Sequence, residues 1–267
     1  MTELATRPQP IDIGADTTAV IVVDMQNAFA SKGGMFDLAG LDISGAAPAV
    51  AATEELLEAA RAAGVEVIYL QMGFRPDLSD AGDIASPAYH KELALRLMRD
   101  RPALAGKLLI NGSWDWQIVD SLSPQPGELV VAKARYDGFT RTGLKQHLSE
   151  RGIRTLLLCG IAANICVEST GRHAFFEEFW PVLVEDAVNH AGPDFNRQAT
   201  VWAFENVFGW VTNTAAVVEA LAEGGKARKL ARPPGAPGMP AGFSPAGSRR
   251  SARSPCGRWP RPSATRC

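Results

Sequence analysis

Three side chains of this 267-residue chain are of the types needed to hydrolyse an amide-like bond through a covalent intermediate: the Asp24 carboxylate, the Lys133 ammonium group and the Cys166 thiol. A cysteine attacks a carbonyl carbon as its thiolate, so it needs a base that takes its proton. A carboxylate within hydrogen-bonding reach can be that base, and an ammonium group can stabilise the negative charge. Each residue alone is a weak indication, because such residues are more often caps, surface charges or core residues. The functional interpretation therefore depends on whether the fold brings the three together.

Two of these residues directly follow stretches that are predicted to be strands. Asp24 follows the run 17–23, whose consecutive Ala, Val and Ile residues are typical of a central parallel strand buried on both faces. Lys133 follows the shorter run 128–132. The carboxyl ends of parallel strands lie at one edge of an open α/β sheet, where such sheets bind their ligands. We therefore expect the two side chains to meet at that edge, although more than a hundred residues separate them.

Cys166 lies at a junction between a predicted strand, 154–159, and a predicted helical segment, 164–180. It would therefore belong to the first turn of a helix. The unpaired N–H groups of a helix N-terminus favour negative charge, so we expect them to lower the pKa of the thiol and to stabilise an oxyanion. Cys159 lies inside the strand, and we interpret it as a structural core residue.

Strands and helices alternate along the chain, which predicts an α/β domain with a parallel sheet covered by helices on both faces. The predicted strands are 17–23, 65–71, 128–132, 154–159, 181–184 and 210–211. The predicted helices are 46–63, 90–99, 113–122, 143–151, 164–180, 194–208 and 215–222. The segments 1–15 and 31–40 are predicted to be surface chain and loop.

The composition is that of an ordinary soluble protein, with 46% hydrophobic and 21% charged residues and a net charge of −2. No apolar run approaches the roughly 20 residues that cross a membrane, so we expect no membrane association. The first apolar run is short and is followed by an aspartate, so we expect no signal peptide. The four cysteines show no paired spacing. We therefore expect neither disulfides nor a zinc site, and a cytoplasmic location.

Residues 226–267 differ from the rest of the chain in charge and composition. They contain ten of the 27 Lys and Arg residues, none of the 29 Asp and Glu residues and eight of the 18 prolines. We predict that this basic tail, rich in Pro, Gly, Ser and Arg, is disordered and that the folded domain comprises 1–225. A basic arm that binds nucleic acid is the functional alternative. Because the arginines are scattered and almost no aromatic residues accompany them, we expect no nucleic-acid partner.

The sequence around the three reactive residues resembles a known family. The stretch 23–27 (VDMQN), Lys133 and the stretch 160–167 (GIAANICV) are similar to the three motifs of the isochorismatase-like cysteine hydrolases, and the resemblance covers about residues 10–223. Within the family, the chain is most similar to the ureidoacrylate amidohydrolases of pyrimidine utilisation. The stretches that carry this closer resemblance are 37–40, 112–115, 135–136, 166–170 and 208–211. The resemblance implies a three-layer αβα sandwich around a mostly parallel six-stranded sheet.

The resemblance also implies roles for the three residues and for the nearby backbone. Cys166 is the expected nucleophile, Asp24 the general base, and Lys133 the group that orients and stabilises the charged pair. In the family a cis non-proline peptide precedes the nucleophile, here at Ile161–Ala162. It would turn the Ala162 N–H toward the site, where it would form an oxyanion hole with the Cys166 N–H. No metal and no cofactor are expected.

The substrate pocket is expected to be built by side chains from the loops that follow the strands. The candidates to line it are Phe29, Phe74, Asp80 and Tyr136, although Phe29 and Phe74 would more often be core residues. The candidates to bind a substrate carboxylate are Arg75, Lys91 and Arg135. Three positions depart from the subfamily pattern: Met72 stands where an Asn is expected, Phe74 where a Trp is expected, and Glu92 where a Ser is expected.

The resemblance implies that the function is hydrolysis of the ureido C–N bond of ureidoacrylate, or of its peroxy form, in uracil degradation. The alternative within the same chemistry is another N-carbamoyl amide hydrolase, acting on biuret or N-carbamoylsarcosine. Isochorismate hydrolysis is disfavoured because that reaction uses no nucleophilic cysteine. A non-catalytic scaffold or a nucleic-acid binder is disfavoured by the intact trio. The expected partners are a small ureido substrate and further copies of the chain in a homo-oligomer.

Overall fold

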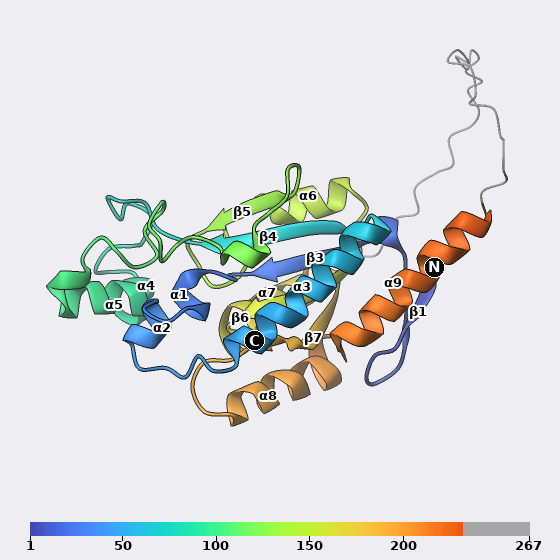
Figure 1. The fold of residues 1–267 in the computed structure, drawn as a ribbon. Helices are drawn as coiled ribbons and strands as arrows, with labels where there is room; N and C mark the ends of the chain where they lie inside the picture. Colours follow the sequence, from blue (N-terminus) through green and yellow to red (C-terminus); the bar gives the residue numbers. More distant parts are fainter. Residues whose placement is uncertain (232–267) are drawn as a thin grey trace, which may run out of the picture. The chain divides into compact units, whose positions relative to one another are not determined.

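The computed structural model describes the backbone of residues 1–231 and the side chains of residues 1–225, with a six-stranded sheet at their centre (Figure 1). The strand order is β5-β4-β3-β6-β7-β8, and every neighbouring pair is parallel. The strands are β3 (Thr18–Val23), β4 (Glu66–Met72), β5 (Leu129–Lys133), β6 (Thr155–Ile161), β7 (Trp180–Asn189) and β8 (Trp210–Thr212). The predicted parallel α/β sheet is therefore confirmed. Strand β3 lies in its interior between β4 and β6, and all six of its residues are buried, as its continuous apolar run predicts.

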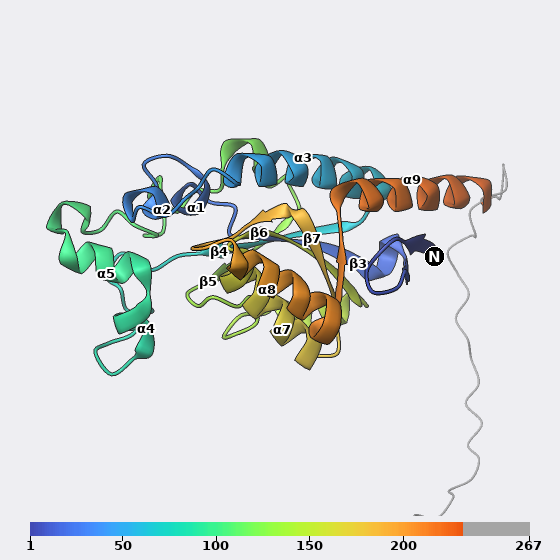
Figure 2. The same ribbon diagram turned by 90° about the horizontal axis from the view of Figure 1, so that it is seen from below.

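Helices cover both faces of this sheet, which confirms the expected three layers (Figure 2). The helices α3 (Ala46–Ala63) and α9 (Thr214–Ala231) pack side by side on one face, and α7 (Glu168–Phe176) and α8 (Phe195–Ala203) lie on the other. Helix α3 has the predicted bounds because Gly64 ends it in a left-handed conformation (φ 73°), in which its N–H bonds the last carbonyls.

Short helices lie beyond the carboxyl ends of the strands, where the loops gather (Figure 1). These helices are α1 (Asn27–Ala30), α2 (Met35–Leu38), α4 (Pro87–Lys91) and α5 (Leu93–Asp100). The helix predicted over 90–99 is in fact split at Glu92, whose backbone is extended (ψ 123°). The remaining helix, α6 (Leu144–Glu150), lies within its predicted range. Single turns are η1 (Ala15–Thr17), η2 (Pro102–Leu104), η3 (Asp120–Leu122), and the π-helical η4 (Ala163–Val167) and η5 (Phe204–Phe208).

The N-terminal segment is not the unstructured surface chain that its polar composition predicts. Strands β1 (Thr2–Leu4) and β2 (Ile11–Ile13) pair antiparallel and form a separate two-stranded sheet. Their alternating pattern buries Leu4, Ile11 and Ile13 against the core. Because only three side chains are involved, the period-2 signal is too short to identify the strands from sequence.

The helix predicted over 113–122 is wrong, since only the turn η3 forms there. Asp115 explains the difference. Its buried carboxylate accepts hydrogen bonds from the backbone N–H groups of Met35 (3.0 Å) and Leu109 (2.8 Å), and thereby ties together two distant loops. A side chain that satisfies non-helical backbone groups competes with helix formation.

The segment after β6 also differs from the prediction. In place of one helix over 164–180, the π-helical turn η4 leads into α7, which ends at Phe176. Strand β7 starts at Trp180 and is longer than the predicted 181–184, with an irregular register opposite β6. Helix α9 continues to Ala231, past the predicted domain boundary after residue 225. The rest of the predicted tail, 232–267, lies outside the described residues, so the domain division stays a prediction.

Gly160 allows β6 to approach β3 next to the site, and we predict that its replacement is costly. It pairs with Val23, has φ +124°, and a Cβ there would lie 1.9 Å from the Val23 carbonyl oxygen. Gly160→Ala should lower the free energy of unfolding by about 3 kcal/mol or more, because backbone strain adds to overpacking. Gly152→Ala is the matched control, since Gly152 has φ +67° but no atom within 4 Å of the added Cβ. It should cost about 1 kcal/mol. Equal losses of the two variants in urea denaturation would contradict the close-approach explanation.

Candidate active site

The fold brings Asp24, Lys133 and Cys166 together at the carboxyl edge of the sheet. Lys133 Nζ lies 2.7 Å from Asp24 Oδ2, and both side chains are fully buried. A side-chain hydrogen bond joins the Cys166 thiol to the Asp24 carboxyl group. Asp24 follows β3, Lys133 is the last residue of β5, and Cys166 lies in the turn after β6. The predicted convergence is therefore present, and it comes from three different strand ends.

Asp24 is held in a backbone conformation that non-glycine residues seldom adopt, with φ +48°. Its N–H donates to the Leu70 carbonyl (3.0 Å), and its Oδ1 accepts the Met72 N–H (3.1 Å). The buried Gln26 amide also binds the Met72 backbone, through both its N–H group and its carbonyl oxygen. The end of β3 is therefore fixed to the end of β4. This fixes the carboxylate beside Lys133 and stores strain at a candidate functional position.

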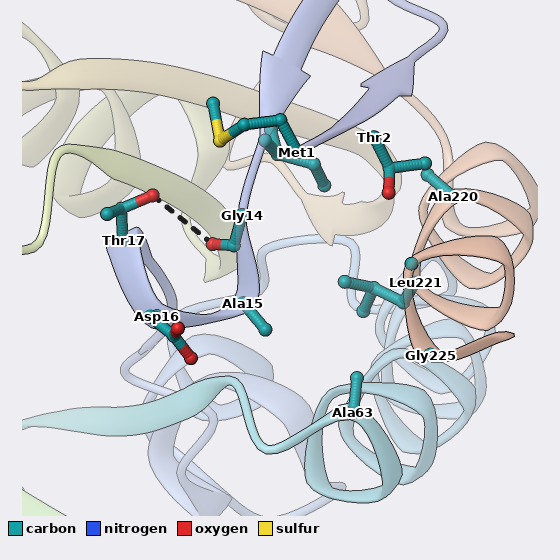
Figure 3. A pocket seen from close by; sticks show the side chains of 12 residues that line it. Met1, Thr2, Gly14, Ala15, Asp16, Thr17, Ala63, Ala220, Leu221 and Gly225 are labelled. Carbon is teal, nitrogen blue, oxygen red and sulfur yellow. Dashed lines mark hydrogen bonds between the residues drawn. The ribbon is translucent and has the colours of Figure 1, made fainter. Parts of the chain in front are cut away.

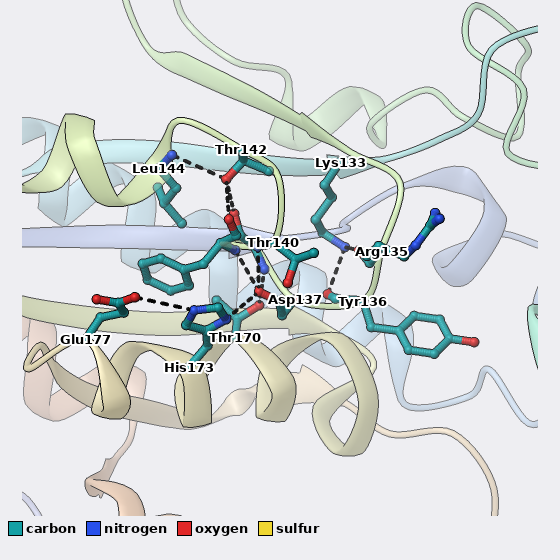
Figure 4. A network of polar contacts seen from close by, with 12 residues as sticks. Lys133, Arg135, Tyr136, Asp137, Thr140, Thr142, Leu144, Thr170, His173 and Glu177 are labelled. Atoms are coloured by element: carbon teal, nitrogen blue, oxygen red, sulfur yellow. Dashed lines mark hydrogen bonds and ion pairs between the residues drawn. The ribbon is translucent and has the colours of Figure 1, made fainter. Parts of the chain in front are cut away.

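Lys133 uses all three of its donors inside the protein. Besides Asp24, it donates to the carbonyl oxygens of Arg135 (3.1 Å) and Tyr136 (3.0 Å) (Figure 4). Burial disfavours its charge, but the Asp24 carboxylate outweighs this effect and raises the pKa of Lys133. Lys133 therefore stays an ammonium at neutral pH.

The loop that presents these carbonyls to Lys133 is anchored to α7. The Asp137 carboxylate accepts the N–H groups of Phe139 (2.9 Å) and Thr140 (2.8 Å) and lies 2.9 Å from His173 Nδ1 (Figure 4). In the same loop, the Gly138 N–H donates to the Thr170 hydroxyl, which in turn donates to the Cys166 carbonyl at 2.7 Å. The surroundings of Lys133 and the backbone of Cys166 are thus held by one network.

The thiol of Cys166 is buried, and burial raises its pKa well above the ordinary value although Lys133 opposes the shift. The net direction is therefore opposite to the lowered thiol pKa expected at a helix N-terminus, and the contribution of the N–H groups themselves stays a prediction. Burial also raises the pKa of Asp24, again opposed by Lys133. A carboxylate with a raised pKa is a stronger base, so the arrangement favours transfer of the thiol proton to Asp24 when the thiol attacks.

The peptide bond between Ile161 and Ala162 is cis, as the family resemblance implies. The Ala162 carbonyl accepts hydrogen bonds from the N–H groups of Ile165 (3.0 Å) and Val167 (3.2 Å). It therefore faces into the turn η4 that carries Cys166. The assignment of the Ala162 and Cys166 N–H groups to an oxyanion hole stays a prediction.

A cavity of about 310 Å³ adjoins the loop whose carbonyls bond Lys133, although none of the three residues lines it. It is lined by Met72, Phe74, Ser86, Pro87, Ala88, Lys91, Glu92, Ala134, Arg135 and Tyr136. Two of the four pocket candidates, Phe74 and Tyr136, are among these residues. Phe29 instead packs edge-on against Phe36 in the core, with ring centroids 5.0 Å apart. Asp80 caps the loop after β4 by accepting the Arg75 N–H (3.0 Å).

The sequence reasoning missed the roles of two buried polar residues. Gln26 lies inside the first motif but is given no role, although it positions the Met72 backbone. Glu92 is noted only as a departure from the subfamily, yet it is a buried carboxyl in the wall of the cavity. A charged residue directly before the buried residues at the start of the amphipathic helix α5 is the one signal that could have marked it as unusual.

A second cavity, of about 420 Å³, lies at the opposite end of β3, between the N-terminal strands and the helices α3 and α9 (Figure 3). Its lining is mostly Ala, Gly, Leu and Met, with Asp16 as its only carboxyl group. The length of β3, roughly 20 Å for six residues, separates it from Asp24. It is therefore not the site of the predicted chemistry.

Two features of the described part of the chain bear on other functions. Residues 1–225 contain no group of three or more His, Cys, Asp and Glu side chains arranged to hold a metal ion. None of the helices in residues 1–231 combines the length and the apolar character that a membrane span requires.

Comparison with known proteins gives a consistent result. Residues 18–216 match the isochorismatase domain family. The chain is 53% identical over 208 residues to the ureidoacrylate amidohydrolase RutB of Rhizobium rhizogenes, covering 78% of this chain and 85% of the relative. It is 50% identical to the protein of the same name from Azorhizobium caulinodans, covering 82% and 97%. Among solved structures, it is similar to a cysteine hydrolase from Pseudomonas syringae, with a TM-score of 0.68 and 28% identity over 84% of this chain and 99% of that one. It is also similar to N-carbamoylsarcosine amidase from Thermoplasma acidophilum (TM-score 0.56, 27% identity, 74% and 96% coverage).

Proposed function

We propose, from the premise that this chain belongs to the isochorismatase family, that it is an amidohydrolase which cleaves the ureido C–N bond of ureidoacrylate in pyrimidine degradation. The products are aminoacrylate and carbamate. The observation that carries the proposal is the identity of about half of the residues to ureidoacrylate amidohydrolases over most of both chains. The Asp24–Lys133–Cys166 trio beside a cavity supplies chemistry that suits this reaction.

In the first half of the reaction, the Cys166 sulfur attacks the ureido carbonyl carbon while the thiol proton passes to Asp24. The carbonyl oxygen becomes an oxyanion, which the N–H groups of Ala162 and Cys166 stabilise. The C–N bond to the acrylate side then breaks, and Asp24 returns the proton to the leaving nitrogen. Lys133 keeps the polar centre oriented and balances its negative charge. Support for these roles comes from the 2.7 Å Lys133–Asp24 contact and the Asp24–Cys166 hydrogen bond.

In the second half, water attacks the carbamoyl thioester that remains on Cys166. Asp24 takes a proton from the water, the C–S bond breaks, and the thiol is restored as carbamate leaves. No external oxidant or reductant is needed, because the net reaction is the addition of one water molecule across a C–N bond.

Substrate preference provides the test of this function. Two nitrogens donate electrons into the ureido carbonyl, so it is a poor electrophile, and expulsion of the amine is slow. The conjugated acrylate spreads the charge of the leaving group, which a saturated analogue cannot do. We therefore expect kcat/KM for ureidoacrylate to exceed that for ureidopropionate by at least about tenfold, or roughly 1.4 kcal/mol. The measurement is released ammonia, with biuret and N-carbamoylsarcosine assayed alongside. Faster turnover of either of these two would overturn the assignment to ureidoacrylate.

We also propose a cytoplasmic homo-oligomer. Helix α8 exposes two large aromatic side chains, Phe195 and Trp202, which lie two turns apart on one face of the helix. Exposed aromatic surface of this kind is typical of sites where another chain packs. A single monomeric mass in light scattering of the purified protein would rule out the homo-oligomer.

A further inference from the structure

The cavity beside the trio carries opposite charges on its walls. Glu92 contributes a buried carboxyl group, with 5% of its surface exposed, and Lys91 and Arg135 contribute cationic groups. The mechanism above gives none of these three a task. A buried carboxyl group is costly to keep in a cavity wall unless it has partners, so its presence calls for a physical explanation.

Glu92 is held close to the reacting groups. Its Oε1 accepts the Ala94 N–H at the start of α5, although this contact is long (3.4 Å), and its carboxyl group forms a side-chain hydrogen bond with the Tyr136 hydroxyl. It lines the cavity together with Arg135 and Tyr136, whose backbone carbonyls accept hydrogen bonds from Lys133. Burial raises the pKa of Glu92, while Tyr136, Ala94 and Lys133 oppose this by favouring the carboxylate. Its oxygens have acceptor capacity left for a ligand, because a carboxylate has about four acceptor sites.

The two cations have no carboxylate partner within residues 1–225. Neither Lys91 nor Arg135 forms an ion pair there, although some arginines, such as Arg7, Arg61 and Arg172, do. Arg135 is nevertheless held in place, because its Nη1 donates to the carbonyl oxygens of Asp80 (3.0 Å) and Ala134 (2.5 Å). Arg75, by contrast, is exposed and is not part of the cavity wall. A fixed guanidinium without a carboxylate partner suits an anionic group of a ligand.

We propose that Glu92 binds the ureido N–H groups of the substrate and that Arg135 binds its carboxylate, so that the cavity accepts the substrate in one orientation only. The proposal rests on the ureidoacrylate function and adds residues that determine its specificity. Ureidoacrylate has N–H donors at one end and a carboxylate at the other, and this polarity matches the two walls. The reverse orientation would bring the substrate carboxylate against Glu92, and like charges would repel each other.

The test compares ureidoacrylate with its methyl ester, which has the same ureido group and the same conjugated linker but no negative charge. Glu92→Gln keeps the size of the side chain and one carbonyl acceptor and removes the charge. If Glu92 binds the ureido end, kcat/KM should fall by about tenfold for both the acid and the ester, since both contain that end. If Glu92 only repels the acid, kcat/KM for the acid should rise while that for the ester stays constant. That result, or no change for either compound, would overturn the proposal.

A second experiment tests whether Arg135 binds the substrate carboxylate. Arg135→Gln should reduce the preference for the acid over the ester by at least about tenfold, mainly through KM for the acid. Arg75→Gln is the matched control, because it removes the same charge from a neighbouring loop outside the cavity. It should leave the acid-to-ester ratio within about twofold. An equal change of the ratio in both variants would show a long-range charge effect and would contradict a specific Arg135 contact.

Folding and function are checked separately. The melting temperature of each variant shows whether it folds, and loss of the α5 cap alone would lower it without changing kcat/KM for either compound. If Glu92→Gln does not fold, Tyr136→Phe is the second variant, since its partly exposed ring stays and only the hydroxyl that bonds Glu92 is lost. For Tyr136→Phe we expect kcat/KM to fall by less than tenfold and equally for ureidoacrylate and its methyl ester. An unchanged kcat/KM for both compounds would overturn the proposal. Failure of the wild type to hydrolyse ureidoacrylate would instead reject the proposed function itself.

Discussion

Cys166→Ser is expected to lower kcat for ureidoacrylate by at least about 10³-fold while the protein stays folded. The attacking atom must lose its proton to Asp24, and burial already raises the pKa of the thiol. A hydroxyl holds its proton far more tightly than a thiol, so Asp24 cannot ionise it to a useful extent. The exchange changes little volume, and the Asp24–Lys133 pair beside it remains intact. The measurements are steady-state turnover and the melting temperature.

Cys159→Ser is the control for this variant. Cys159 is buried in β6, and its thiol contacts the Ile21 carbonyl oxygen at 3.6 Å, a partner that a hydroxyl can also bind. It takes no part in the trio, so kcat should stay within about twofold of the wild type. Intact-mass analysis of the reacting wild type should also detect a carbamoyl group on Cys166. Retention of more than a tenth of the wild-type rate in Cys166→Ser would reject the covalent mechanism.

The raised pKa of Cys166 changes how the reaction is expected to begin. The sequence predicts a thiolate that a helix N-terminus has already stabilised, but the structure has a buried, hydrogen-bonded thiol. In the proposed mechanism, the proton would therefore move to Asp24 during the attack rather than before it. The Lys133 ammonium group would balance the one negative charge of the site, which lies on Asp24 before the transfer and on Cys166 after it.

Features that depend on local pattern are predicted well from the sequence. The run of β-branched residues in β3 requires burial on both faces, and Gly64 fixes the end of α3. The convergence of Asp24 and Lys133 follows from one topological rule, because parallel strands end at the same edge. These predictions need no knowledge of which loops meet.

Features that depend on contacts between distant loops are not predictable in this way. Asp115 prevents a local helix by bonding Met35 and Leu109. Glu92 is at a helix start in the sequence, but it becomes part of the cavity only because the junction between α4 and α5 lines it together with Tyr136 from the loop after β5. In the same way, the sequence gives Arg135 and Arg75 as equal candidates to bind the substrate carboxylate. Only the structure shows that Arg135 lines the cavity and that Arg75 does not. The convergence of the candidate trio thus follows from the sequence, whereas the composition of the cavity wall requires the structure.

Lys133→Ala is expected to lower kcat/KM by about 10²-fold or more and to destabilise the protein as well. The variant leaves Asp24 fully buried without its cation, and the carbonyls of Arg135 and Tyr136 lose their donor. Breaking a buried ion pair from one side costs about 3–5 kcal/mol. Loss of the ammonium also raises the pKa of Asp24 further, because Lys133 is the main group that opposes the effect of burial. Asp24 would then be protonated more often and would take the thiol proton less readily. Lys133→Arg should not restore the rate, because a planar guanidinium cannot occupy the position of the compact ammonium group.

The pH dependence of stability distinguishes this explanation from a simple loss of packing. A carboxyl group whose pKa is higher in the folded than in the unfolded protein favours folding when it is protonated, and this contribution is lost as pH rises. The stability difference between Lys133→Ala and the wild type should therefore be small near pH 4 and grow toward neutral pH. A packing defect would give a stability difference that does not change with pH.

Lys145→Ala is the control, because Lys145 pairs with Glu177 on the surface and should change stability by less than about 1 kcal/mol at either pH. Near-normal turnover in Lys133→Ala would show that Asp24 and Cys166 act without a buried cation, and the assignment of Lys133 to the catalytic trio would then be wrong.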